Sequence, residues 1–119
     1  MKVILDTNFL IDCLRFKVDL KSELSGNELF VLDSVIFEIG KIMRGGTKES
    51  SLAKLVLELV AKNNFKVLVT GKKNVDESLL DYSKQGYAIA THDKILKNKL
   101  KKADAKIIYI RQKKYLVVE

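Results

Sequence analysis

The sequence predicts an α/β fold in which helices flank a mostly parallel central sheet. Five short apolar runs lack the alternation of apolar and polar residues, which is typical of strands buried on both faces. Helical patterns lie between these runs, so right-handed helical crossovers are expected to join consecutive parallel strands. The expected strands span residues 3–5, 29–32, 67–69, 87–90 and 107–110.

The intervening segments show the spacing of amphipathic helices. A helix is expected over residues 7–14, directly after the first strand, and another over residues 34–44. Further along, apolar residues recur at i, i+3 and i+4, as one buried face of a helix requires. These residues are Leu52, Leu55, Val56, Leu59 and Val60, and later Leu96, Leu100 and Ala103.

A single domain is predicted over residues 1–119. A chain of 119 residues with 47% hydrophobic residues has the size of one compact domain. Its largest interruption, residues 45–47 (Gly-Gly-Thr), is expected to be a turn, because it is too short for a linker. The last apolar run, residues 115–118, follows residue 110 too closely for a helical crossover. It forms an edge strand, packs back on the domain or makes a dimer contact.

The single cysteine and the lack of a long apolar run predict a cytoplasmic protein. Cys13 cannot form an internal disulfide, and its neighbours Leu10 and Leu14 suit a reduced, buried thiol. The opening apolar residues are interrupted by Asp6, and no run reaches the length that spans a membrane. We therefore expect neither export nor a membrane anchor.

Positive charge is concentrated toward the end of the chain. The formal net charge is +7, and residues 94–114 contain a single acid, Asp104. This distribution favours a polyanion as a partner. The alternative is a solvated lysine-rich surface, because basicity alone is a weak indication of a partner. The basic residues of this stretch are Lys94, Lys97, Lys99, Lys101, Lys102, Lys106, Arg111, Lys113 and Lys114.

Two acids follow expected strands. Asp6 comes directly after the first strand, and Asp93 follows the fourth at the start of the next helix. The alternative for each is a helix N-cap, a position that Asp favours. Sites in α/β folds lie beyond the carboxyl ends of the strands, and two acids at neighbouring strand ends therefore indicate a site there.

Two further acids are expected to face inward on helices. Glu38 lies three residues after Val35 and four before Ile42, at the border of the apolar stripe, where a surface glutamate is not expected. Asp76 falls on the apolar arc of its own helix. Both carboxylates therefore need a partner.

The helix that carries Asp76 also has a structural alternative. The macrodipole favours acids in the first helical turn, and Asn74 with Glu77 resembles a capping box. This explains the place of Asp76 along the helix, but not its inward face. On the same wheel, Glu77 and Asp81 turn toward solvent.

Four such acids, Asp6, Glu38, Asp76 and Asp93, favour a divalent metal ion. Buried carboxylates are costly unless cations pair with them, and no Lys or Arg is evident on these inner faces. Oxygen ligands without a cluster of cysteine or histidine suit Mg²⁺ or Mn²⁺. Such ions hold a phosphodiester, lower the pKa of bound water and stabilise a leaving oxygen. The basic residues would contact the phosphate backbone.

The chain resembles PIN-domain proteins in several ordered motifs. These are VILDTN at residues 3–8, the helix carrying Glu38, VDESLL at residues 75–80 and IATHD at residues 89–93. The order and spacing match over almost the whole chain. No single motif is specific, so the resemblance rests on the ordered set, with Thr-x-Asp after a late strand.

The resemblance implies a three-layer α/β/α sandwich, and endonucleolytic cleavage of RNA that leaves a 5′-phosphate. It also implies an acidic pocket that binds Mg²⁺ or Mn²⁺, and a homodimer, which is usual in the family. By position, Thr91 and Asn8 would form hydrogen bonds at the pocket, with Asp81 a weaker candidate. The metal-binding and catalytic acids would be Asp6, Glu38, Asp76 and Asp93.

Some features depart from the common family pattern. His92 stands where relatives often have Asn, and we expect it to be a solvated loop residue. The short helical region before Leu29 and the basic tail resemble archaeal relatives of the ribosomal-RNA-processing PIN proteins more than VapC-type toxins. The substrate stays open between these roles, and so does the partner, which would be an antitoxin or a ribosome-assembly protein.

Two alternatives come from other classes of protein. A haloacid-dehalogenase-like phosphatase also begins with an Asp after the first strand, but it needs a second Asp two positions later, where this chain has Asn8. The stronger alternative is a non-catalytic RNA-binding or ribosome-assembly module with the same fold. Salt-sensitive RNA binding would fit both this module and the nuclease. Metal-dependent cleavage that is lost on removing Asp6 or Asp76 would fit only the nuclease.

Overall fold

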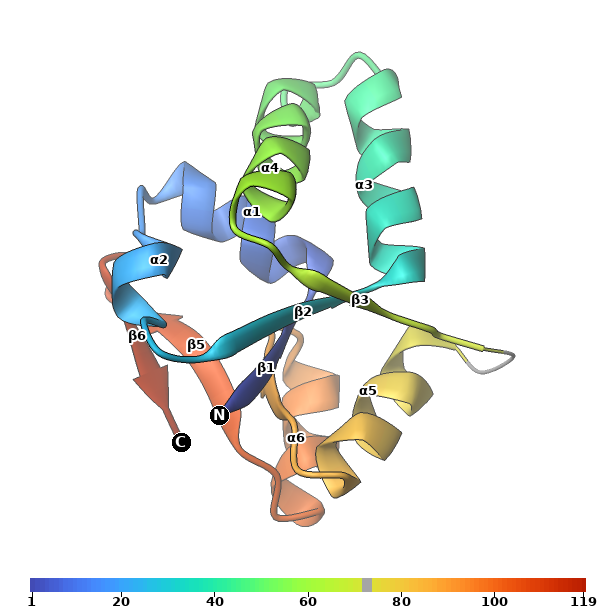
Figure 1. Cartoon of the computed structure of the whole chain (residues 1–119), viewed down its shortest axis with the longest axis vertical. Coiled ribbons are helices and arrows are strands. Elements are labelled where there is room, and N and C mark those ends of the chain that lie inside the picture. The colour runs from blue at the N-terminus through green and yellow to red at the C-terminus, as the bar shows by residue number, and fades with distance from the viewer. Residues whose placement is uncertain (72–73) are drawn as a thin grey trace.

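A six-stranded sheet lies between two layers of helices in the computed structural model, which describes residues 1–71 and 74–119 (Figure 1). The strand order is β3-β2-β1-β4-β5-β6, in which β1 to β5 are parallel and β6 is antiparallel to β5. The predicted α/β class with a mostly parallel sheet is thus confirmed. The strands are β1 (Lys2–Leu5), β2 (Glu28–Leu32), β3 (Lys66–Leu68), β4 (Ala88–Ala90), β5 (Ile107–Arg111) and β6 (Tyr115–Val118).

Helices cover both faces of this sheet. Figure 1 shows α1, α3 and α4 on one face and α5 and α6 on the other, while the short α2 leads into β2. Residues 45–47 form the turn between α3 and α4, as their two glycines predict. None of the helices in residues 1–71 and 74–119 has the length and apolar character to cross a bilayer. The helices are α1 (Thr7–Arg15), α2 (Leu20–Glu23), α3 (Asp33–Arg44), α4 (Ser50–Lys62), α5 (Val75–Lys84) and α6 (Lys94–Lys102).

The core is centred on β1, whose residues 3–5 have no exposed surface. Phe9 and Leu10 of α1 pack on one side of the sheet, and Leu96 and Leu100 of α6 belong to the same core. Burial of one such side chain stabilises the fold by about 1.5–3 kcal/mol. Cys13 is also fully buried, as its apolar neighbours predict.

The strands at the two edges of the sheet are more exposed than those at its centre. β3 is an edge strand, and Val67 is 52% exposed, so the prediction that every apolar run is buried on both faces is wrong for β3. An edge strand has a neighbouring strand on one side only, and β3 pairs with β2 alone. At the other edge, residues 115–118 form the edge strand that was one of three alternatives, with Tyr115 opposite Arg111.

The strand order creates a switch point beside β1. The chain runs outward from β1 through β2 to β3 on one side, and from β4 through β5 to β6 on the other. Leu5 lies opposite Ala90, and the backbone N–H of Asp6 donates to the Ala90 carbonyl at 3.0 Å. Ligands of open α/β sheets bind at such a point, beyond the carboxyl ends of the strands.

Candidate active site

Asp6 links the end of β1 to the start of α1. One carboxylate oxygen accepts the backbone N–H of Thr7 at 2.8 Å and caps the helix, as the structural alternative predicts. The other oxygen accepts the hydroxyl of Thr91 at 3.1 Å. Capping therefore uses one oxygen and leaves the second for contacts across the switch point.

Thr91 joins the two acids that follow neighbouring strands. It is completely buried after β4, and its hydroxyl oxygen accepts the backbone N–H of Asp93 at 3.2 Å while donating to Asp6. Asp93 is exposed and caps α6, because its side chain accepts the N–H of Leu96 at 3.0 Å. A single hydroxyl thus fixes the positions of both acids relative to each other.

Glu38 reaches the same region from α3. The hydroxyl of Thr7, itself buried, donates to a Glu38 carboxylate oxygen at 3.2 Å. Glu38 is nevertheless exposed, so the expectation that it does not lie at the surface is wrong. At the border of the apolar stripe, its long side chain carries the carboxylate to the solvent-facing rim.

Asp76 occupies the first turn of α5 and is half-buried, whereas Glu77 is exposed. Asn74 is the N-cap, because its side chain accepts the backbone N–H of Glu77 at 2.8 Å. Glu77 accepts the side-chain amide of Asn74 at 3.3 Å, whereas a capping box would have it accept the Asn74 backbone N–H. Asp81 is half-buried rather than turned to solvent as expected. The partly buried arc of α5 is wide near Asp81, since residues 80–83 are all half-buried.

Three of the predicted acids interact electrostatically. Burial raises the pKa of the Asp6 carboxyl, hydrogen bonds from Thr7 and Thr91 lower it, and the charges of Glu38 and Asp76 raise it again. Within the described residues, no three acidic, histidine or cysteine side chains are arranged to hold a metal ion. Asp6 therefore interacts electrostatically with Glu38 and Asp76. Thr91 connects Asp93 to Asp6 through hydrogen bonds.

A pocket of about 360 Å³ opens beside these acids. Of the predicted residues, Asp6, Asn8 and Asp93 line it, while Glu38 and Asp76 do not. The remaining lining residues were not among those predicted from the sequence. These are Ile11, Asp12, Arg15, Glu49 and His92.

His92 is half-buried and held on both ring nitrogens. Its Nδ1 lies 2.8 Å from an Asp12 carboxylate oxygen, and the backbone N–H of Ile110 donates to its Nε2 at 3.3 Å. The ring also packs against Phe9, with 5.2 Å between centroids. The expectation of a solvated loop histidine is therefore wrong.

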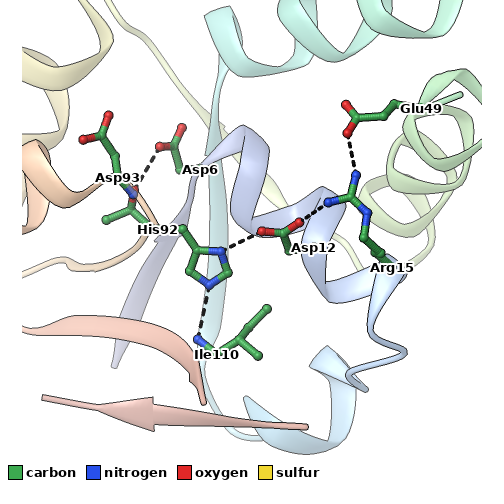
Figure 2. Close-up of polar contacts among 8 residues, drawn as sticks. Asp6, Asp12, Arg15, Glu49, His92, Asp93 and Ile110 are labelled. Carbon is green, nitrogen blue, oxygen red and sulfur yellow. Dashed lines mark hydrogen bonds and ion pairs between the residues drawn. The ribbon is translucent and has the colours of Figure 1, made fainter. Parts of the chain in front are cut away.

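Figure 2 shows Asp12 between His92 and Arg15, with Arg15 continuing to Glu49. The spacing of Asp12 and Arg15, one helical turn apart, is visible in the sequence. The contact with His92 joins residues 80 apart, and no local pattern reveals it.

Comparison with known proteins places the fold and motifs in one family. The family model of the PIN like domain matches residues 3–113. Ribonuclease VapC4 of Methanocaldococcus jannaschii is 28% identical over 125 residues, covering 98% of this chain and 95% of the relative.

Solved structures show the same fold. The PIN domain endonuclease Utp24 superposes with a TM-score of 0.81 at 26% identity, covering 99% of this chain and 90% of the other. A domain of a functionally unknown protein from Methanocaldococcus jannaschii superposes with a TM-score of 0.66 at 17% identity, covering 92% and 91%. At that identity, the second likeness concerns the fold alone. Because the family model spans almost the whole chain, the chain belongs to the PIN-like domain family.

Proposed function

We propose that this protein is a metal-dependent endoribonuclease that hydrolyses RNA phosphodiester bonds at the switch point of the sheet. In this proposal Asp6, Glu38, Asp76 and Asp93 are the catalytic and metal-binding residues. The observation that carries it is Asp6, a carboxylate at the end of β1 whose pKa is raised by burial and by the charges of Glu38 and Asp76. Relatives that are named as a ribonuclease and an endonuclease support the same reaction.

The chemistry of the acidic residues fits Mg²⁺ or Mn²⁺. The donors are carboxylate oxygens, which these ions prefer. Burial first, and then the charges of Glu38 and Asp76, raise the pKa of Asp6, and a bound cation would favour its charged form. A divalent cation there would supply polarisation of the phosphodiester and a lower pKa for the attacking water. The side chains would have to converge further than they do in this structure, in which no three form a ready metal site among the described residues.

The chain's own residues would orient the acids. Thr91 holds Asp6 and Asp93 in one arrangement, and Thr7 holds Glu38. Asn8, exposed at the pocket, is a candidate for a hydrogen bond to substrate. In the hydrolysis, the oxygen of water bonds to phosphorus and the P–O3′ bond breaks. The attacking water loses a proton and the leaving 3′-oxygen gains one, so the products are a 5′-phosphate and a 3′-hydroxyl.

The basic residues supply the surface on which RNA would lie. α6 begins immediately after Asp93, so its lysines start beside the acids. Lys97 packs over the ring of Tyr109 at 4.6 Å, which positions its ammonium group on the β5 side. Lysines and arginines that neutralise backbone phosphates give salt-dependent, sequence-independent affinity.

We also propose a homodimer and an RNA target in one of two settings, toxin-type cleavage or RNA processing. Expression of a toxin should arrest growth until an antitoxin is supplied, whereas a processing enzyme should not arrest growth. Light scattering of the purified protein measures the oligomeric state.

The proposed function is tested by cleavage of structured and single-stranded RNA with Mg²⁺, Mn²⁺ or EDTA. We expect EDTA to abolish cleavage and Asp76→Asn to reduce the rate on the order of a hundredfold while the variant stays folded. Glu77→Gln is the matched control, because it removes one charge from the next residue and keeps the backbone N–H that donates to the N-cap Asn74. If the wild type binds RNA without cutting it in any metal, or if Asp76→Asn cuts equally well, the non-catalytic RNA-binding module replaces the enzyme.

A further inference from the structure

Part of the pocket beside the acids is lined by residues that have no role in the proposed catalysis. Asp6 and Asp93 line one part, and Asp12 and Glu49 add two more carboxylates. Four carboxylates would repel an approaching RNA backbone. Among the described residues that line this pocket, Arg15 is the only lysine or arginine.

Arg15 lies in the last turn of α1 and is held by two carboxylates. One terminal nitrogen of its guanidinium donates to Asp12 at 2.7 Å, and the other donates to Glu49 at the start of α4. The side chain is 41% exposed. A guanidinium has five N–H donors in a planar fork and matches the oxygens of a phosphate.

The two carboxylates that hold Arg15 differ in how firmly they are fixed. Asp12 is 20% exposed, and its second oxygen accepts the Nδ1 proton of His92, whose Nε2 accepts from the Ile110 backbone. Glu49 is 45% exposed, and an ion pair between side chains as exposed as these contributes little to stability. Arg15 is thus anchored by Asp12 and restrained by an exchangeable Glu49 (Figure 2).

We propose that Arg15 is a substrate-binding residue that contacts a phosphate of the RNA backbone next to the cleaved bond, and that Glu49 occupies its guanidinium when RNA is absent. This inference rests on the proposed function in that RNA is the substrate. Binding of a phosphate exchanges the Glu49 carboxylate for a phosphate oxygen, while Asp12 continues to orient the guanidinium. His92 is a positioning residue in this arrangement, because it acts through Asp12.

The alternative for Arg15 is a purely structural link between α1 and α4. The two roles predict opposite effects of Glu49. If Arg15 binds RNA, Glu49→Gln frees the guanidinium and strengthens binding, whereas Arg15→Gln weakens it. If Arg15 is only a link, both substitutions act in the same direction on stability and neither changes RNA affinity specifically.

The test measures fluorescence anisotropy of a labelled single-stranded RNA with variants made in the Asp76→Asn background, where the proposed cleavage is strongly slowed. We expect Arg15→Gln to raise the Kd about tenfold and to reduce the slope of log K against log salt by roughly 0.7. Glu49→Gln is expected to lower the Kd, and this gain should vanish when Arg15→Gln is also present. Glu58→Gln is the matched control for charge, because Glu58 is an exposed acid on the same helix.

A second readout uses the protein with Asp76 intact. Arg15→Gln should raise KM and leave kcat unchanged, and Arg15→Lys should lie between the two, since it retains the charge without the fork. Thermal unfolding shows that each variant is folded. If RNA is not cut but the anisotropy changes occur as expected, the proposed function fails, while the contact of Arg15 with a phosphate of bound RNA stands. Unchanged Kd and salt slope in Arg15→Gln, weaker binding in Glu49→Gln, or no RNA binding at all would overturn it.

Discussion

The hydroxyl of Thr91 donates a 3.1 Å hydrogen bond to Asp6, although the two residues are 85 positions apart. The same oxygen accepts the backbone N–H of Asp93 at 3.2 Å. The contact is possible because β1 and β4 are adjacent parallel strands whose carboxyl ends meet. A buried, neutral side chain therefore sets the geometry between two acids that follow different strands.

Thr91→Val should reduce RNA cleavage more than Thr91→Ser. Valine keeps the shape of threonine but removes both hydrogen bonds, so Asp6 loses its orienting donor and the cleavage rate should fall about 10–100-fold. Serine keeps the hydroxyl and should retain most of the rate despite a small loss of packing. kcat and KM at saturating Mn²⁺ measure the difference, and equal rates in the two variants would remove Thr91 from the site.

Asp6→Asn should stabilise the metal-free protein at neutral pH. The raised pKa of Asp6 means that its charged form is disfavoured in the folded state, by burial first and then by Glu38 and Asp76. Asparagine caps helices as well as aspartate does. We expect a melting temperature higher by roughly 3 °C at pH 7 in EDTA.

The sign of this effect gives its pH dependence. A folded pKa above the unfolded value contributes stability that is present below about pH 4 and is lost as pH rises through the folded pKa. The difference between wild type and Asp6→Asn should therefore shrink from pH 7 to pH 4. Asp19→Asn makes the same chemical change at the exposed N-cap of α2 and is the matched control. A destabilised Asp6→Asn at pH 7 would contradict the explanation.

Cys13 should be inert in the folded protein. Burial, with a smaller effect of the Asp12 charge, raises the pKa of its thiol to about 12. Because the thiolate is the reactive form, its reaction with a disulfide reagent at pH 8 should be on the order of a thousandfold slower than in denaturant. Release of the coloured thiolate product measures both rates. A native rate close to the denatured rate would show that Cys13 is accessible.

Much of the fold follows from local pattern. The five apolar runs became β1 to β5, and the glycine turn at 45–47 separates α3 from α4 as expected. Strand order has no local signal, because it depends on which strands pair after the crossovers form. The exposure of β3 and the pairing of Tyr115 opposite Arg111 are consequences of that order.

The site was less predictable than the fold. The positions of Asp6 and Asp93 follow from the ends of two strands. Both residues cap a helix, and the charges of Glu38 and Asp76 also act on Asp6. The helical wheel gave the wrong exposure for Glu38, because a wheel does not account for the length of a side chain. The Glu38 carboxylate reaches the exposed surface. The pairing of His92 with Asp12 arises only when β4 and α1 come together, so no periodicity could reveal it.

The acids of the pocket are tested most directly by the binding of Mn²⁺, followed by the electron paramagnetic resonance signal of the free ion. Asp6, Glu38, Asp76 and Asp93 are proposed to bind the metal, so wild-type protein should deplete the free signal. Asp6→Asn should bind Mn²⁺ at least about tenfold more weakly, while Asp19→Asn should bind as wild type does. If wild type leaves the free signal unchanged, or if Asp6→Asn depletes it equally, the metal site proposed here is contradicted.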